Sequence, residues 1–329
     1  MSPTASRFKF CFTVDTEPDD LWASNRVLSF DHFDRLASFH RRVVEHGGRP
    51  TYLTTSEVAE SPQARRAVDS CLSFGQCELG AHFHTWTRKW PFQIPSFPSA
   101  VHAMAHCLGE QTERAMLHFT CKVLDATFHV QPHSYRGGRW SLGTHTAASL
   151  ASCGIGVDSS VLPGVSFSNF RSPLIDGADY RKANPCPHWL KNSEPRVLEI
   201  PLGAAWWPAC VPQTPFCLLK PAQRILNFVR VPSVGHHWLR PTYYSPRTLR
   251  GVMRSLKRRN IPIWVCMIHS SELRPCSPLP SEDRVNRFID RCMQTITLAA
   301  EMGAVPATLS EAALAWTEHS DPLPAVKQH

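Results

Sequence analysis

Short runs of apolar residues alternate with longer amphipathic stretches along most of the sequence. The apolar runs have the length and composition of buried β-strands, and the stretches between them carry apolar residues at helical spacing. Because parallel strands are joined by crossover connections, usually helices, this alternation predicts a parallel sheet with helices packed against it. The expected strands are residues 8–14, 50–54, 77–82, 134–136, 155–158, 196–201 and 263–269.

Capping residues and glycines mark the ends of the expected helices. The helix expected at residues 29–46 carries Phe33 and Val43 at helical spacing and ends at Gly47. The helix expected at residues 245–260 begins with a serine N-cap and a proline at the first helical position. About seven strand–helix units favour a closed or partly closed sheet, so the predicted fold class is α/β, a distorted (β/α) barrel of about seven strands. The other expected helices are residues 56–72 with a break near Pro62, 109–128, 141–153, 281–303 and 310–316.

Length and composition are those of one large domain. The chain has 329 residues, of which 43% are hydrophobic, enough to bury a sizeable core. We expect residues 1–329 to form a single domain with long loop insertions near residues 85–106 and 162–194. Both insertions are rich in proline and aromatic residues, including Trp86 and Trp90. Sugar rings stack on aromatic faces, so the insertions are candidate substrate walls; that they only cover the barrel is an equally weighted alternative.

The charge pattern argues against a nucleic-acid partner. The formal net charge is +8, but Lys and Arg are scattered, and the one short cluster, at residues 254–259, is typical of a solvated helix face. The charge also suits an acidic polysaccharide or a lipid-linked phosphate. The sequence shows no run of about 18 apolar residues and no apolar segment of the length that a secretory signal needs, so we expect no membrane span and a cytoplasmic protein with its 12 cysteines reduced. Nothing in the sequence indicates an oligomeric state.

Five polar residues stand where expected strands end. In a (β/α) barrel the carboxyl ends of the strands meet at one face, and active sites are built there. One polar residue at such a position would carry little weight, but five in otherwise apolar strands are hard to explain as accidents of the core. They are Asp15, His82, Arg136, Asp158 and His269.

Two of these strand ends carry paired metal-binding residue types. Asp15 and Glu17 place two carboxylates after the first strand, and His82 and His84 form a His-x-His pair after the third. A histidine pair alone is most often a surface feature. Together with carboxylates at a second strand end and His269 at a third, it indicates a catalytic Zn²⁺ or similar ion, with one position left for water.

The sequence resembles the polysaccharide deacetylase superfamily of carbohydrate esterases, which includes chitin and peptidoglycan deacetylases. The resemblance runs from about Phe8 to Trp316. Five segments carry it, in chain order, and each matches one of the motifs of that family. They are Phe12-Thr13-Val14-Asp15-Thr16-Glu17, Glu78-Leu79-Gly80-Ala81-His82-Phe83-His84, Ser134-Tyr135-Arg136-Gly137-Gly138, Gly156-Val157-Asp158-Ser159-Ser160 and Ile268-His269-Ser270.

The resemblance implies a role for each candidate residue. The first motif supplies a catalytic base, Asp15, and a metal carboxylate; the second supplies metal histidines; Arg136 of the third orients the base. His269 of the fifth would be the general acid, with Asp158 holding its imidazole in the charged form. A backbone N–H near Tyr135 or Arg136 would bind the oxyanion.

Two departures from the family pattern shift the expected ligands. Position 16 is Thr, so the second carboxylate would be Glu17, although Asp15 as the metal carboxylate stays open. Position 86 is Trp, so the second histidine ligand would be His84. The expected metal set is therefore Glu17, His82 and His84, and the expected substrate-binding residues are Tyr135, Trp86 and Trp90.

Taken together, the sequence predicts a metal-dependent deacetylase acting on carbon–nitrogen bonds. It would remove N-acetyl or O-acetyl groups from a sugar or polysaccharide precursor, using a divalent metal for which Zn²⁺ is the first choice and Co²⁺, Ni²⁺ or Mn²⁺ are alternatives. One rival is an amidohydrolase acting on a non-sugar C–N bond. A second is a catalytically degenerate barrel that only binds carbohydrate, which the changes at positions 16 and 86 would fit. Retention of Asp15, Arg136 and His269 argues against that second rival.

Overall fold

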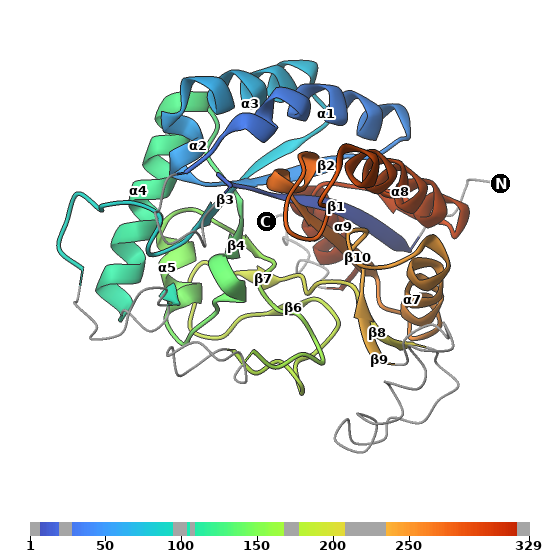
Figure 1. The fold of residues 1–329 in the computed structure, drawn as a ribbon. Coiled ribbons are helices and arrows are strands. Elements are labelled where there is room, and N and C mark those ends of the chain that lie inside the picture. The colour runs from blue at the N-terminus through green and yellow to red at the C-terminus, as the bar shows by residue number, and fades with distance from the viewer. Residues whose placement is uncertain are drawn as a thin grey trace, which may run out of the picture.

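A curved sheet with helices around its outer face forms the body of the protein (Figure 1). The computed structural model describes residues 7–19, 28–94, 104–105, 109–167, 178–207 and 235–320. The helices are α1 Leu36–Glu45, α2 Ser56–Glu60, α3 Pro62–Phe74, α4 Glu110–Phe128, α5 Thr146–Ser152, α7 Pro246–Arg258, α8 Glu282–Glu301 and α9 Leu309–Ser320, with 3₁₀ turns η1 Asp31–Arg35, η3 Gly138–Trp140 and η5 Ser270–Leu273. The strands are β1 Phe8–Thr16, β2 Pro50–Thr54, β3 Glu78–Phe83, β4 Ser134–Gly137, β5 Val157–Asp158, β6 His188–Trp189, β7 Leu198–Glu199, β8 Ala204–Trp207, β9 Gly235–Trp238, β10 Ile263–His269 and β11 Ala304–Pro306.

Seven strands run parallel in the order β10-β1-β2-β3-β4-β5-β7. A parallel bridge between Leu202, just beyond β7, and Val265 of β10 brings the two ends of this row together. The sheet is therefore curled into a distorted barrel, and the predicted fold class is confirmed. The sequence did not predict the antiparallel strand β6 beside β7, the pair β8–β9, or β11 beside the start of β1.

Alternating side chains along the strands fill two separate apolar clusters. Val265 and Leu198 belong to a cluster on the inner face of the barrel, which apolar residues of α9 such as Leu309 complete. Their neighbours on the opposite face, such as Trp264, pack in the larger cluster between the sheet and the helices. Each fully buried large apolar side chain contributes about 1.5–3 kcal/mol to folding. Because successive residues of a strand point to opposite faces, the cluster to which one residue belongs shows where its two neighbours point.

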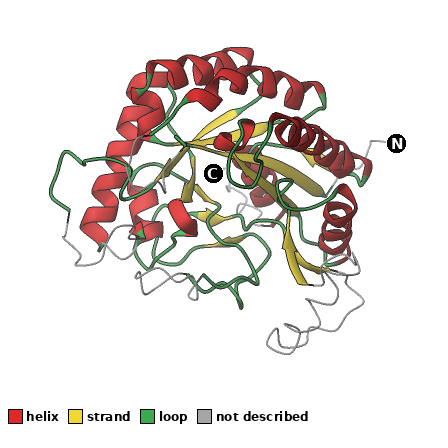
Figure 2. Cartoon of the chain, in the orientation of Figure 1, coloured by secondary structure: helices red, strands yellow, loops and turns green. Residues whose placement is uncertain are grey.

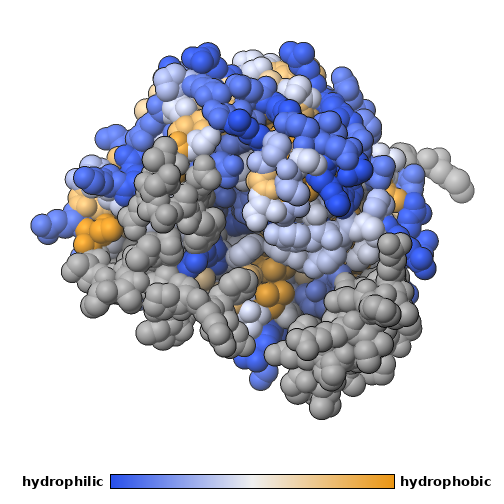
Figure 3. Space-filling view, viewed as in Figure 1, coloured by the Kyte–Doolittle hydropathy of each residue, from blue (hydrophilic) through white to orange (hydrophobic). Residues whose placement is uncertain are grey.

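Most helices begin within one residue of the predicted position, but α1 and α5 begin later than predicted, at Leu36 and Thr146. Ser245 caps α7 by accepting a hydrogen bond from the Thr248 amide, and Ser61 caps α3 in the same way, with a proline following each. Figure 2 shows helices to the left of, above and to the right of the strands. Hydrophilic residues dominate the surface over the helices at the top of that view (Figure 3), as expected where α1 and α3 turn their polar sides outwards. No helix in the described part of the chain is long and apolar enough to cross a membrane.

The first loop insertion places Trp90 in the core. Its ring lies 5.8 Å from that of Phe83 and 5.7 Å from that of Phe119, and its indole N–H donates to the Thr85 carbonyl. Only 9% of the residue is exposed. Trp90 therefore fits the alternative that the insertion covers the barrel, and the structure gives no support to a role in binding substrate. Phe97 and Phe170, two further aromatic residues of the insertions, lie outside the described residues.

Replacing Trp90 with alanine is expected to lower the free energy of unfolding by about 3–5 kcal/mol, the usual cost of deleting a large aromatic side chain from a core. Urea denaturation followed by circular dichroism measures it, with Trp90→Phe as the matched control that keeps most of the packing. A stable Trp90→Ala protein with weakened sugar binding would reverse this assignment and return Trp90 to the substrate wall.

Candidate active site

The two residue pairs singled out in the sequence each occupy one side of an extended strand. Asp15 lies near the end of β1 with Glu17 just beyond it, and His82 lies in β3 with His84 just beyond it. In an extended chain, residues two apart point the same way. The residue between the histidines, Phe83, points the opposite way into the helix-covered core. Spacing of two therefore aims both side chains of each pair at the same place, the carboxyl ends of the strands.

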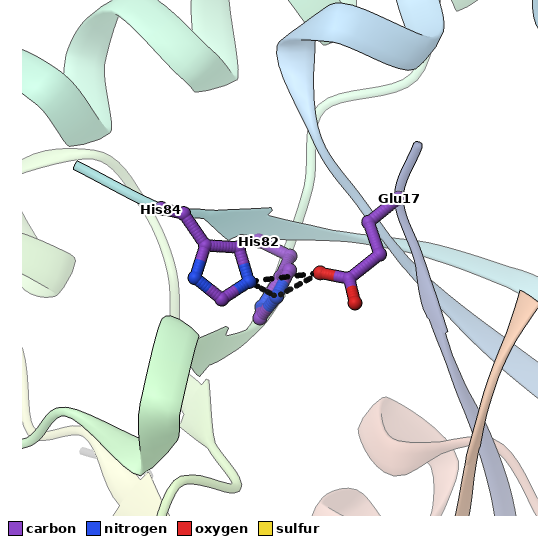
Figure 4. Close-up of side chains that lie close together, drawn as sticks. All are labelled: Glu17, His82 and His84. Carbon is purple, nitrogen blue, oxygen red and sulfur yellow. Dashed lines mark hydrogen bonds and ion pairs between the residues drawn. The ribbon is translucent and has the colours of Figure 1, made fainter. Parts of the chain in front are cut away.

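Glu17, His82 and His84 meet at that place (Figure 4). Glu17 Oε2 lies 2.8 Å from His84 Nε2 and 3.2 Å from His82 Nε2, and the two ring nitrogens are 3.2 Å apart. One ligand atom from each residue falls within 4.8 Å of the others, and all three residues are buried. The structure thus brings together the three residues predicted as metal ligands.

The surroundings of these residues fit a metal ion. His82 Nδ1 donates to the Arg136 carbonyl at 2.6 Å, so the lone pair on its Nε2 faces Glu17 and His84. Metal-binding histidines are commonly held in this way by a partner on the other ring nitrogen. Gly138 lies against the His84 ring, where an added Cβ would come within 2.6 Å of Nδ1. One carboxylate oxygen and two imidazole nitrogens are a donor set suited to Zn²⁺ and related ions.

Close contacts among Glu17, His82 and His84 shift the pKa values of all three groups. Burial raises the pKa of Glu17, but the neighbouring His84, His82 and His269 outweigh it and hold that pKa well below its usual value. Burial lowers the pKa of His82, yet its hydrogen bond to Glu17 and the charges of Asp15 and Glu17 raise it overall. For His84 burial prevails, and its pKa is lowered. Glu17 is therefore an ionised carboxylate facing two imidazoles.

Asp15 is held by a fully buried arginine. Arg136 Nη1 donates to Asp15 Oδ1 at 2.6 Å, and only 1% of Arg136 is exposed. The rest of the guanidinium is anchored by Ser159, whose carbonyl accepts from Nε at 2.8 Å and whose hydroxyl accepts from Nη2 at 3.2 Å. These bonds leave Asp15 Oδ2 facing His269. The expected pairing of an arginine with the candidate base is present.

His269 lies directly across from Asp15 on the neighbouring strand β10. Its Nε2 is 3.8 Å from both Asp15 Oδ2 and Glu17 Oε1. Its side chain is 27% exposed, which leaves it accessible to a substrate. The other ring nitrogen, Nδ1, faces Arg240 Nη2 at 2.6 Å, with Glu272 Oε1 at 3.9 Å.

Arg240 and Glu272 are not among the residues predicted from the sequence. Glu272 stands three residues after His269, and the structure has the reciprocal bonds of a capping box there, so this spacing could have drawn attention to it. Arg240 follows β9, a strand that the sequence did not predict, and no motif marks it.

The structure does not place Asp158 where the sequence analysis expected it. Its neighbour Val157 belongs to the inner cluster of the barrel, so Asp158 points to the opposite face. There its Oδ1 accepts from the Ser160 hydroxyl at 2.7 Å, and its register partner is Glu199 of β7. The expectation that Asp158 holds the His269 imidazole is therefore wrong in this structure, because the alternation of a strand separates the two side chains.

Asp158 and Glu199 form a buried pair of carboxyl groups, and the stability of the protein should depend on pH through them. Burial, together with the nearby Asp158, raises the pKa of Glu199 well above its usual value; burial also raises that of Asp158. A carboxyl group with a raised folded-state pKa holds its proton longer in the folded than in the unfolded chain. The contribution of Glu199 to stability is then greatest below its unfolded pKa of 4.5 and is lost as the pH rises toward its folded pKa.

Glu199→Gln should flatten that decline, because the amide cannot ionise. For one proton the decline has a limiting slope of about 1.4 kcal/mol per pH unit. Urea unfolding of the wild type and the variant at a series of pH values above 5 measures it, with the exposed Glu45→Gln as control. Parallel stability curves for wild type and Glu199→Gln would contradict the expectation.

The two remaining predicted substrate contacts differ. Tyr135 is fully buried, with its ring 6.0 Å from that of Phe83 in the helix-covered core, so its side chain is not available to a substrate. Trp86 is half-buried, and its ring lies 4.6 Å from that of His84. The Arg139 guanidinium lies over the same indole at 5.3 Å. Of the aromatic residues predicted to bind substrate, only Trp86 borders the metal-ligand cluster in the described structure.

Comparison with known proteins bears on the fold. No protein-family model matches the sequence, and no curated protein matches it. Among solved structures, a GH57 branching enzyme from Thermococcus kodakaraensis aligns with 95% of this chain and 71% of its own, at a TM-score of 0.54 and 11% identity. A 4-alpha-glucanotransferase from Thermococcus litoralis aligns with 94% of this chain, at a TM-score of 0.50 and 12% identity. This chain spans 39% of that enzyme.

Polysaccharide deacetylases are also among the solved structures found. A "putative polysaccharide deacetylase" from Mycobacterium smegmatis aligns with 94% of this chain and 96% of its own, at a TM-score of 0.48 and 15% identity. At such identities the likenesses concern the fold alone. What the site does is therefore argued from its own residues.

Proposed function

We propose that this chain is a metal-dependent deacetylase that removes an N-acetyl or O-acetyl group from a sugar or polysaccharide precursor. The observation that carries the proposal is the meeting of Glu17, His82 and His84 beside the Asp15–Arg136 pair. His269 completes the group from the adjacent strand. Because these residues come from both ends of the chain, we further propose that residues 1–329 act as one catalytic domain.

The proposed metal ligands are Glu17, His82 and His84, and Zn²⁺ is the ion we favour over Co²⁺, Ni²⁺ or Mn²⁺. When bound, such an ion supplies a Lewis acid that polarises an acetyl carbonyl and lowers the pKa of water. The alternative in which Asp15 is the metal carboxylate remains part of the proposal, since both carboxylates lie at the end of the same strand.

The chain's own residues divide the remaining work. Asp15, oriented by Arg136, takes the proton of the attacking water through the oxygen that Arg136 does not bind. His269 gives its Nε2 proton to the leaving nitrogen, and Asp15, whose Oδ2 lies 3.8 Å from Nε2, then passes to that ring nitrogen the proton it took from the water. Trp86, packed on His84, is the aromatic residue that we assign to contact with a sugar ring of the substrate.

Acetate release from chitooligosaccharides, with and without a chelator, tests the function. Acetate should form, stop after chelation, and resume when Zn²⁺ is restored. Hydrolysis of simple non-sugar amides with none of the sugar would instead support the amidohydrolase rival. Binding of chitooligosaccharide without acetate release, in protein that holds metal, would support the degenerate binding barrel.

A further inference from the structure

Arg240 contacts His269 on the side away from the metal ligands. It is 2% exposed, and one of its terminal nitrogens, Nη2, donates both to His269 Nδ1 and to Glu272 Oε1, each at 2.6 Å. Its other terminal nitrogen, Nη1, points at the sulfur of Met267, which lies two residues before His269 on β10. The nitrogen that meets His269 is thus tied on its other side to a carboxylate.

Glu272 in turn is tied to the backbone that carries His269. Its Oε2 accepts from the His269 amide at 3.0 Å and from the Thr242 hydroxyl at 2.9 Å. Burial raises the pKa of Glu272, but Arg240 and His269 lower it to about 2, so the group is ionised. Burial opposes the charge of Arg240, yet Glu272 raises its pKa above the usual value. The pair is a fully formed buried ion pair whose geometry is fixed from both ends.

Aromatic rings hold the guanidinium in place. Arg240 Cζ lies 5.3 Å from the Trp238 ring and 5.2 Å from the Tyr243 ring. A planar guanidinium packed in this way has one orientation available to it, and its N–H groups lie in fixed directions. Arg240 is therefore a rigid donor to His269.

A guanidinium has five N–H donors and no acceptor. The nitrogen of His269 that faces it must therefore present a lone pair, which leaves the ring proton on Nε2. That nitrogen is the one facing Asp15 Oδ2 and Glu17 Oε1, both at 3.8 Å. The tautomer set by Arg240 is thus the one that offers a proton to the space between the metal ligands and the candidate base.

We propose that Arg240, anchored by Glu272, is the positioning residue that fixes His269 as its Nε2–H tautomer. The kinetic effects expected from this inference rest on the proposed function. The tautomer of His269 does not depend on it. Arg240, and not Asp158, is the residue that contacts the His269 ring on the side away from the metal ligands.

Nitrogen NMR of protein labelled with ¹⁵N-histidine tests the tautomer directly. The His269 signals are identified by their loss in His269→Gln. We expect a protonated Nε2 and an unprotonated Nδ1 in the metal-loaded wild type, and a mixture of tautomers in Arg240→Met. A wild-type ring protonated at Nδ1, or a tautomer unchanged in Arg240→Met, would overturn the proposal.

Removing Arg240 alone leaves the buried Glu272 charge without its partner, which can unfold a protein. The double variant Arg240→Met/Glu272→Gln removes both charges and keeps the hydrogen-bonding shape of Glu272, so it carries the test if the single variant does not fold. Arg240→Lys is the conservative control, because it restores a cationic donor.

On a substrate with an N-acetyl group, kcat of Arg240→Met should fall by about 10–10²-fold, the usual effect of removing a group that orients a catalytic side chain. KM and metal content should stay within twofold, and Arg240→Lys should recover part of the loss. A fall in metal content together with kcat would give Arg240 a purely structural role. A wild type with the expected tautomer but no acetate release would leave this inference standing and reject the proposed function.

Discussion

Replacing Asp15 with asparagine is expected to lower kcat on an N-acetylated sugar by about 10²–10⁴-fold, the range for loss of a general base. Asparagine keeps the shape of the side chain and an oxygen that can still accept from Arg136 Nη1. It cannot take a proton from water. Kinetics on a chitooligosaccharide, with metal content measured on the same preparation, checks the expectation.

Metal content separates the two roles open to Asp15. If Glu17 is the metal carboxylate, Asp15→Asn keeps its ion and loses only rate. If the ion is lost together with activity, Asp15 is a ligand. Asp31→Asn, an exposed carboxylate paired with Arg274, is the matched control and should change neither quantity. Full activity in a folded Asp15→Asn protein would remove Asp15 from the mechanism.

The His269→Ala variant should lose about 10²–10⁴-fold on an acetamide, because an amine leaves poorly without a proton. An activated phenyl acetate needs no such help, so the loss on that ester should be much smaller. The metal should stay bound, since His269 lies on β10, whereas Glu17 follows β1, His82 lies in β3 and His84 follows β3.

Comparison of the two substrates is the deciding measurement for His269. The exposed His133→Ala serves as control for the loss of a histidine. Equal losses on amide and ester, accompanied by loss of the ion, would make His269 a metal ligand. His84 would then be the histidine whose assignment falls.

The parts of the fold and the site that the sequence predicts are those set by local pattern. β10 runs from Ile263 to His269, as predicted, because its apolar run stops abruptly at a polar residue. The spacing of two between Asp15 and Glu17 and between His82 and His84 already implies a shared side of a strand. Because the carboxyl ends of barrel strands meet at one face, residues of three strands could be predicted to lie there together.

The direction in which a side chain points cannot be predicted from the sequence where a strand is short. β5 has two residues, so its sequence contains no alternation from which to tell that Val157 faces inward and Asp158 outward. Only the packing of Val157 with the inner cluster settles it. The same limit explains Tyr135, whose neighbour Arg136 takes the inward position on β4.

Contacts between segments that are far apart in the chain also cannot be predicted from a single sequence. Arg240 and His269 are brought together by the fold, and neither the residues around Arg240 nor its spacing to His269 announces their contact. Trp90 shows the converse: an aromatic residue in a long insertion has the same sequence signal whether it lines a site or, as here, packs in the core.

Elemental analysis of protein purified without chelators tests the central claim most directly. The three ligand atoms of Glu17, His82 and His84 lie within 4.8 Å of one another and suit one divalent ion. We expect one tightly bound divalent ion per chain, Zn²⁺ first among the candidates, and loss of that ion in a folded His82→Ala/His84→Ala variant. A folded wild type without metal that binds none on addition of Zn²⁺, or a double variant that keeps its full complement, would contradict the account.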